Sequence, residues 1–191
     1  QAEFQVIVNP EDKNSVPIDL AKLLLKDEAM DDIEINYDVL SSNSDILSGD
    51  SISESYTDVF RINYYRQNHN FTKEVSIGSL NLDLYYKSLI VLVYRIFLEL
   101  GINSNHIRLR QHSDDEKAFY ALDAWDIEIL LKDIGWTEIA GIHDRGAYDL
   151  RNSAHNPIPH ILEIAIGIDR MFYSIMDNLY EEKEESKGKS I

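Results

Sequence analysis

Pro159 to Tyr173 reads PHILEIAIGIDRMFY, and the spacing of its apolar residues changes within the run. His160 to Ile166 alternates as a strand does, whereas the apolar residues after Gly167 recur at helical spacing as far as Leu179. The sequence therefore predicts a strand, a turn at the glycine and then a helix.

Two charges interrupt this run, Glu163 in the predicted strand and Arg170 in the first turn of the predicted helix. The free N–H groups of a first turn attract anions, and a guanidinium can hold a phosphate through two parallel hydrogen bonds. The same residues also suit a buried corner in which Arg170 pairs with Asp169 or another acid. Both interpretations stay open on these residues alone.

The composition favours one globular domain, or one domain with a small insert, because 44% of the 191 residues are hydrophobic. Leu80 to Leu100 is interrupted by Asn81, Asp83, Lys87, Arg95 and Glu99, so we expect a core helix there and no membrane partner. No secretory signal precedes the first strand, and we expect a cytoplasmic protein. The chain has no cysteine and its six histidines lack metal-like pairing, so no zinc is expected. The net charge of −16 argues against a broad phosphate-binding surface on this chain itself.

The apolar spacing predicts an α+β fold. Strands are expected at 1–8, 33–39, 107–111, 122–130 and 136–142, helices at 18–30 and 80–100, a serine-rich loop at 41–55 and a charged tail after residue 180. Alternation places Glu138 on the same face as Trp136 and Ala140. The aromatic residues of 56–71, including Tyr64 and Tyr65, could stack on a base, but they are more typical of a subdomain core.

Three predicted strands each carry one glutamate among largely apolar neighbours, and two arginines lie nearby in the sequence; the five are Glu3, Glu138, Glu163, Arg145 and Arg170. If these strands belong to one antiparallel sheet, the five charges could line one cavity. Carboxylates would hold an ammonium group or magnesium, and the arginines a carboxylate or phosphates, which suits a zwitterion together with a magnesium–nucleotide. The alternative is five ordinary charges on half-exposed strands.

Five stretches resemble one family, the archaeal and eukaryotic type of glycyl-tRNA synthetase, which is a class II aminoacyl-tRNA synthetase. They are QAEFQVIVNPEDK at 1–13, IRLRQH at 107–112, EKAFYALDAWDIEI at 116–129, GWTEIAGIHDRGAYDL at 135–150 and PHILEIAIGIDR at 159–170. Together they cover about a third of the chain in the family's order. The resemblance implies part of a class II antiparallel sheet flanked by helices, with a small inserted α+β subdomain.

For glycine, the resemblance implies that Glu3 receives the ammonium group and that Arg145 faces the carboxyl end of glycine or of the adenylate. Glu163, Ile164 and Ala165 stand where the family has its EPS glycine pocket. The serine hydroxyl of that pocket is therefore missing, which should cost about 1 kcal/mol of binding.

For ATP, the resemblance implies that Glu138 and Ile139 line the nucleotide site and that Arg170 is the third-motif arginine that grips phosphate. Glu138 is the candidate for helping to hold Mg²⁺, and the sequence leaves open whether Asp126, Glu128 or Glu116 joins it. Arg145 and Arg170 are thus the expected catalytic residues. Phe119 is a second departure, since the family more often has histidine there.

The resemblance divides the chain into a strand that follows the second motif (1–13), an insertion subdomain (14–79), the rest of the catalytic core through the third motif (80–180) and a tail or linker (181–191). The first two class II motifs would precede Gln1, and the anticodon-binding domain would follow the chain. We therefore expect the isolated chain to be inactive.

The function that follows is part of a glycine–tRNA ligase, which activates glycine with ATP and Mg²⁺ and transfers it to tRNA(Gly), as a homodimer in the full-length enzyme. Two alternatives remain open. One is a non-catalytic, synthetase-like accessory or binding module, and the other is a related ligase for another amino acid, which Ala165 permits.

Overall fold

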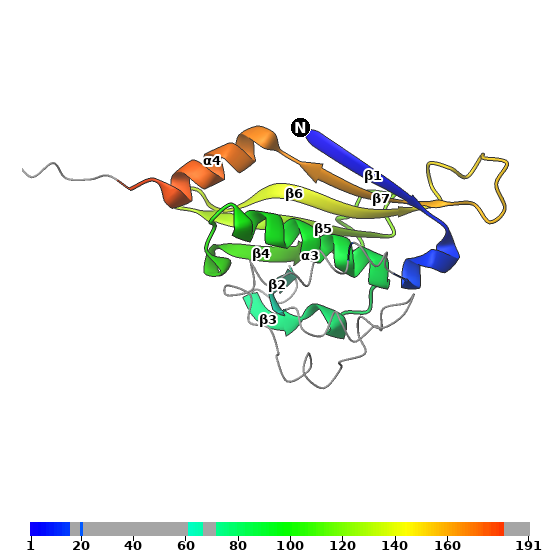
Figure 1. Ribbon diagram of the computed structural model, residues 1–191, viewed down its shortest axis with the longest axis horizontal. Helices are drawn as coiled ribbons and strands as arrows, with labels where there is room; N and C mark the ends of the chain where they lie inside the picture. Colours follow the sequence, from blue (N-terminus) through cyan, green and yellow to red (C-terminus); the bar gives the residue numbers. More distant parts are fainter. Residues whose placement is uncertain (16–19, 21–60, 67–71, 182–191) are drawn as a thin grey trace, which may run out of the picture.

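A seven-stranded sheet forms the frame of the protein in the computed structural model, which describes residues 1–15, 20, 61–66 and 72–181 (Figure 1). The strands are β1 (Ala2–Val8), β2 (Arg61–Arg66), β3 (Thr72–Ser76), β4 (Ile107–Gln111), β5 (Asp123–Leu131), β6 (Gly135–Gly146) and β7 (His160–Ile166). Their order across the sheet is β1-β7-β6-β5-β4-β2-β3, and all neighbours are antiparallel except β2 and β4, which are parallel. The predicted α+β class and the mainly antiparallel sheet are confirmed.

Helix α3 (Leu84–Glu99) lies across one face of the sheet (Figure 1) and supplies a larger share of the core than any other described element. Phe97 and Ile90 on the helix and Trp125 and Ile127 on β5 are fully buried. The predicted stop at Gly101 is confirmed: this glycine has φ +91°, and the N–H of Ile102 donates to the carbonyl of Phe97, as in a Schellman motif.

The helix begins four residues later than the predicted Leu80, because a short 3₁₀ turn (Ile77–Ser79) precedes it and Asp83 occupies its N-cap position. The Asp83 carboxylate does not cap the helix. It forms an ion pair with the buried ammonium group of Lys13, at 2.9 Å.

The strand-to-helix turn at Gly167 is also confirmed. β7 ends at Ile166, Gly167 is the N-cap, and helix α4 (Ile168–Leu179) follows with Arg170 in its first turn. The N–H of Gly167 donates to the carbonyl of Ile139 on β6, so the start of α4 is attached to the neighbouring strand.

The expected strands at 107–111 and 122–130 correspond to β4 and β5, whereas β6 runs beyond the expected 136–142 to include His143, Asp144 and Arg145. Tyr64 is buried and packs against Trp125 at 5.5 Å between ring centroids, which confirms its role in a core. Four other expectations lie outside the described residues: the helix at 18–30 apart from Leu20, the strand at 33–39, the loop at 41–55 and nearly all of the charged tail. Within the predicted insertion, β2 and β3 continue the same sheet.

One face prediction is wrong. Glu138 lies opposite Glu128 and Trp136 opposite Leu130, so these two residues of β6 share a face, as expected, but Ala140 lies opposite Ile127 on the other face. The register shifts between Ile127 and Glu128, which leaves Ile139 as an extra residue on β6. A bulge of this kind reverses the alternation, so Glu138 turns away from the core while Ala140 joins it.

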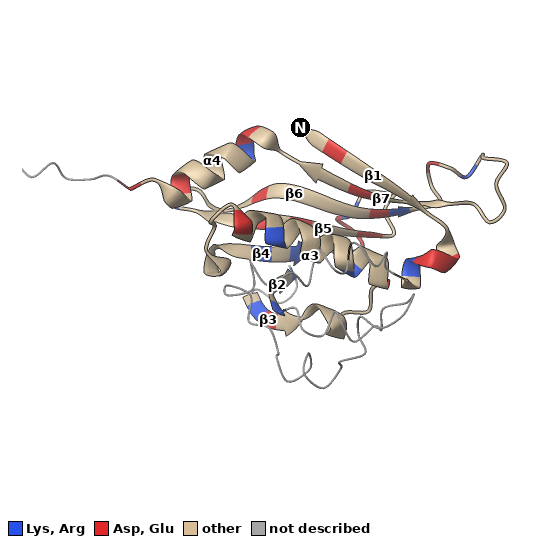
Figure 2. Ribbon diagram, in the orientation of Figure 1, with Lys and Arg blue, Asp and Glu red and all other residues tan. Residues whose placement is uncertain are grey.

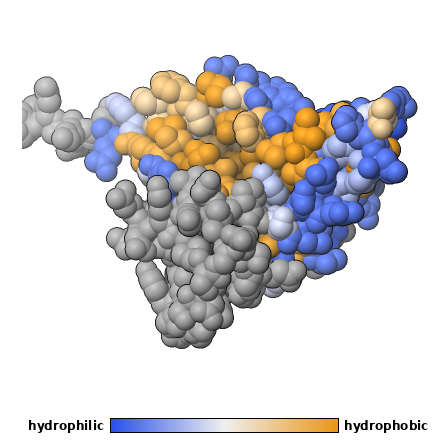
Figure 3. Space-filling view, turned by 45° about the vertical axis from the view of Figure 1, so that its right-hand side comes forward, coloured by the Kyte–Doolittle hydropathy of each residue, from blue (hydrophilic) through white to orange (hydrophobic). Residues whose placement is uncertain are grey.

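Figure 2 marks the charged residues along the strands. By the register of the strands, most of them lie on the face of the sheet opposite α3, which we call the open face. By register it includes Glu163 on β7, His143 on β6, Asp126 on β5 and Arg110 on β4. Figure 3 shows apolar residues gathered on one side of the molecule. Phe4 on the edge strand β1 and Phe172 on α4 are exposed apolar residues. Among the described helices, none is long and apolar enough to cross a membrane.

Candidate active site

A cavity of about 400 Å³ opens on the open face, where β6, β7 and the start of α4 meet. Five of the predicted site residues line it, namely Glu138, Ile139, Glu163, Ala165 and Arg170. They come from two adjacent strands and one helix, and the contact of Gly167 with Ile139 holds these elements together. Of the five charged residues expected to line one cavity, three do so, namely Glu138, Glu163 and Arg170, whereas Glu3 and Arg145 do not.

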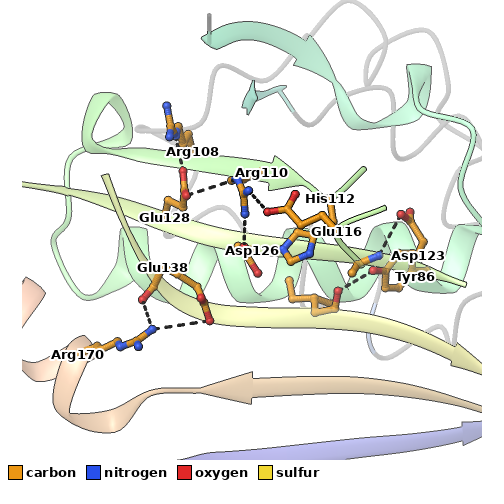
Figure 4. A network of polar contacts seen from close by, with 12 residues as sticks. Tyr86, Arg108, Arg110, His112, Glu116, Asp123, Asp126, Glu128, Glu138 and Arg170 are labelled. Atoms are coloured by element: carbon orange, nitrogen blue, oxygen red, sulfur yellow. Dashed lines mark hydrogen bonds and ion pairs between the residues drawn. The ribbon is translucent and has the colours of Figure 1, made fainter. Parts of the chain in front are cut away.

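At one end of the cavity, Arg170 lies beside Glu138 (Figure 4). Its guanidinium donates to the Glu138 backbone carbonyl at 3.0 Å and lies 3.7 Å from the Glu138 carboxylate. Both side chains are more than half exposed, at 59% and 54%, so this ion pair is weak and the guanidinium can turn toward a bound anion. Its place in the first turn of α4 adds the helix N–H groups to the same region.

At the other end, Glu163 is almost fully buried and receives hydrogen bonds from three side chains on two neighbouring strands. Arg145 donates to its Oε2 at 2.9 Å and Gln5 donates to the same oxygen at 3.2 Å. The third contact joins Oε1 to Nδ1 of His143, also at 3.2 Å. Three of the roughly four lone-pair directions of this carboxylate are thus occupied by protein groups.

Arg145 lies next to the cavity but does not line it. It bonds Asp149 through two nitrogens, at 2.7 and 2.9 Å, and it also bonds Glu163 and stacks over the Tyr120 ring at 4.2 Å. The hydrogen bonds to Asp149 are the largest cause that raises the pKa of Arg145, and they lower the pKa of Asp149. The guanidinium is a fixed cation whose donors are mostly engaged.

The two remaining predicted residues lie away from the cavity lining. Glu3 is on the exposed edge strand β1, opposite Ala165, and its carboxylate accepts from Gln5 at 2.7 Å. Ile164 is 6% exposed and packs in the hydrophobic core on the α3 side of the sheet. The middle residue of the Glu163–Ala165 segment therefore supports the pocket from behind.

Sequence reasoning missed Gly141, His143 and Tyr120, which also line the cavity. A Cβ at Gly141 would lie 3.2 Å from Cε1 of His143, so the glycine leaves room for the imidazole. The available signal was the alternation of Gly141, His143 and Arg145, which extends the strand beyond Ile142 and puts all three on one face.

A second polar network continues along the open face over β4 and β5 (Figure 4). Arg108 pairs with Glu128, Arg110 bonds Asp126 at 3.0 Å and also pairs with Glu116, and His112 Nε2 lies 2.6 Å from Asp126. The hydrogen bond to Asp126 raises the pKa of His112, and burial opposes this. Asp126, Glu128 and Glu116 are thus committed to protein cations.

The described residues contain no group of three His, Asp or Glu side chains that could hold a metal ion. Mg²⁺ in nucleotide sites is commonly bound by one or two carboxylates together with substrate phosphates, so it does not require such a group. Glu138, beside Arg170 on the cavity wall, fits that limited role.

No protein-family model matches the chain. Its sequence is 51% identical over 59 residues to the glycine–tRNA ligase of Methanothrix thermoacetophila, a match that spans 31% of this chain and 10% of that protein. This chain is related to glycine–tRNA ligases. The ligase of Methanocaldococcus jannaschii is 43% identical over 81 residues, or 42% of this chain and 14% of the relative.

The similarity to glycine–tRNA ligases also reaches bacteria. The ligase of Mycoplasmopsis synoviae is 29% identical over 119 residues, which is 54% of this chain and 26% of that protein. The matches thus span between about a tenth and a quarter of the ligases compared. They confirm the resemblance to glycyl-tRNA synthetase and a synthetase-related function.

Proposed function

We propose that this chain forms part of the active site of a glycine–tRNA ligase that joins glycine to AMP and then to tRNA(Gly). The observation that carries the proposal is that Glu138, Glu163 and Arg170 line one cavity on the open face. A cavity with carboxylates and an exposed arginine offers groups of both signs, which suits an amino acid and a nucleotide bound side by side.

In the proposed reaction, a carboxylate oxygen of glycine attacks the α-phosphorus of ATP, and the bond to pyrophosphate breaks. No proton needs to move, so catalysis rests on positioning and on stabilising the charge of the phosphates. Arg170, in the first turn of α4, would hold phosphate oxygens. Glu138 would face the Mg²⁺ that the triphosphate carries, and Ile139 would pack beside the nucleotide.

Glycine would lie toward Glu163 and Ala165, with Arg145 near its carboxyl end and Glu3 near its ammonium group. The second step passes glycine from the adenylate to the terminal ribose of the tRNA. We place this reaction in a cytoplasmic homodimer of the full-length enzyme.

The test is glycine-dependent exchange of pyrophosphate into ATP by the protein that carries this sequence. Arg170→Ala should lower the exchange rate at least about a hundredfold, because it removes a charged donor to phosphate. Arg151→Ala is the matched control, since Arg151 is exposed, stacks on Tyr148 at 4.0 Å and does not line the cavity. Near-normal exchange by the Arg170→Ala variant would refute the assignment.

Two other functions each have one observation in their favour. The donors of Arg145 are mostly engaged by Asp149 and Glu163, which suits a synthetase-like binding module without catalysis. Ala165 lacks the hydroxyl of the family's glycine pocket, which suits a ligase for another amino acid. Exchange assays with each of the twenty amino acids separate the three: glycine alone, another amino acid, or none supports exchange.

A further inference from the structure

The floor of the cavity contains a histidine to which none of the proposed roles refers. His143 lies on β6 directly opposite Glu163 of β7, and its Nδ1 lies 3.2 Å from the Glu163 carboxylate. The Cε1–Nε2 edge of the ring lies over Gly141, because a Cβ on that glycine would be 3.2 Å from Cε1 and 3.3 Å from Nε2 of His143. Nδ1 therefore faces the carboxylate, while Nε2 lies over the floor of the cavity.

This arrangement fixes the tautomer of a neutral imidazole. A carboxylate only accepts hydrogen bonds, so Nδ1 must carry the proton that the contact requires. The lone pair of the neutral ring then resides on Nε2. Among the described contacts, no side-chain hydrogen bond to Nε2 of His143 occurs, so this acceptor is available to a ligand.

Glu163 itself has little capacity left for a substrate. Arg145 and Gln5 occupy Oε2, and His143 occupies one direction of Oε1. Its negative charge is also close to the Arg145 guanidinium, which weakens its attraction for a second cation. The carboxylate is therefore better placed to orient the imidazole than to bind an ammonium group alone.

The adjacent row of the sheet leaves space for a small amino acid. Glu3, Ala165, Gly141 and Asp126 lie side by side across β1, β7, β6 and β5. Of the two central residues, Ala165 has only a methyl group and Gly141 has no side chain. An ammonium group above this row would lie between the Glu3 carboxylate and the His143 ring. Since Ala165 and Gly141 offer no side-chain acceptor, His143 supplies one from the neighbouring row.

We propose that Nε2 of His143 accepts a hydrogen bond from the α-ammonium group of the amino acid, and that Glu163 is the positioning residue that holds the imidazole in this tautomer. The inference rests on the proposed function and adds a substrate contact to it. His143 would replace part of the hydrogen bonding that the alanine at position 165 cannot provide.

Substitution of His143 by Asn and by Gln tests the roles of its two ring nitrogens separately. In His143→Asn, the amide nitrogen can keep the bond to Glu163, but no atom remains at the position of Nε2. In His143→Gln, the longer side chain can place an amide oxygen near that position. His143→Phe keeps the ring without either nitrogen, and His155→Phe, on an exposed loop, is the matched control.

The measurement is the KM for glycine and the KM for ATP in pyrophosphate exchange by the protein that carries this sequence. His143→Phe and His143→Asn should each raise the KM for glycine at least about tenfold, because a hydrogen bond to a charged group is lost. The KM for ATP should stay within about twofold, and His143→Gln should retain more glycine affinity than His143→Asn. The control should match the native protein.

A purely structural role predicts the reverse order, with His143→Asn near normal and His143→Gln impaired, and this result would overturn the inference. An unchanged glycine KM in all three variants would overturn it as well. If the native protein shows no glycine-dependent exchange, the proposed function fails and the inference fails with it. Exchange by the native protein therefore distinguishes failure of the proposed function from failure of the role assigned to His143.

Imidazole ¹⁵N shifts of the native protein provide a readout that needs no turnover. We expect a protonated Nδ1 and an unprotonated Nε2 on His143, with the Nε2 signal moving when glycine is added. Glu163→Gln should release this tautomer preference, since the amide can also donate. The opposite tautomer in the native protein would contradict the proposed contact.

Discussion

The two faces of the sheet both contain buried residues, but these are apolar beneath α3 and charged on the open face. On β5, Trp125 and Ile127 are fully buried beneath α3, while their neighbours Asp126 and Glu128 are 4% and 8% exposed on the open face, where they are surrounded by arginines and a histidine. The covered face excludes water with a helix, and the open face does so with paired charges. Fractional exposure alone therefore does not distinguish the scaffold from the polar face that carries the site.

The largest expected effect tests the covered face. Phe97→Ala should lower the free energy of unfolding by about 4 kcal/mol, because it removes a fully buried ring between α3 and the sheet. Phe172→Ala is the matched control, since Phe172 is 64% exposed on α4, and it should cost less than about 1 kcal/mol. Urea unfolding measures both, and similar losses would contradict this description of the core.

The second-largest effect is expected at Lys13, a buried cation at the edge of the covered face. Burial lowers the pKa of Lys13, but its bonds with Asp144 and Asp83 outweigh this and raise it, so the ammonium group remains charged. Lys13→Met should cost about 3 kcal/mol, because it leaves Asp144 buried without its cation. Lys117→Met should cost less than about 1 kcal/mol, since its partner Asp114 is 91% exposed. Equal losses in urea unfolding would refute the distinction.

On the open face, function should change more than stability. Gly141→Ala would place a methyl group 3.2 Å from the His143 ring, which is 20% exposed and can move aside. We expect the glycine KM to rise several-fold while the free energy of unfolding changes by less than about 1 kcal/mol. Asn152→Ala, on an exposed loop, is the control. A large loss of stability with an unchanged KM would assign Gly141 to the scaffold instead.

The smallest effect concerns pH. The bond to Asp126 raises the pKa of His112 above its ordinary 6.5, so protonated His112 stabilises the fold below pH 6.5. This contribution is lost as the pH rises through the raised pKa of the folded state. Asp126→Asn should lower the pKa of His112, as followed by NMR titration of the imidazole, whereas Asp177→Asn on α4 should not. An unchanged pKa in Asp126→Asn would contradict the assigned cause.

The spacing of apolar residues predicted those strands and helices whose bounds depend on their own stretch of sequence. The strand, glycine and helix of 160–179 occur as the change of period predicted, and β4 has its predicted bounds. Five of the predicted site residues line one cavity, because their strands do pair in one sheet.

What the sequence could not reveal depends on the pairing between strands. The bulge at Ile139 follows from the register of β6 against β5, and it reversed the expected face of Ala140. The extension of β6 to Gly146 likewise depends on its pairing with β7, and it brings His143 beside Glu163. The engagement of Arg145 by Asp149 was also hidden, because a nearby acid in the sequence does not establish a bond.

The most direct test of the central claim is a crystal structure of the protein that carries this sequence with glycyl-sulfamoyl-adenosine, a stable analogue of glycyl-adenylate. The account predicts the analogue in the cavity of the open face, with its ammonium group near His143 and Glu3 and the sulfamate group, which replaces the phosphate, toward Arg170. An analogue bound elsewhere, or no binding at millimolar concentration, would contradict the claim that this face activates glycine.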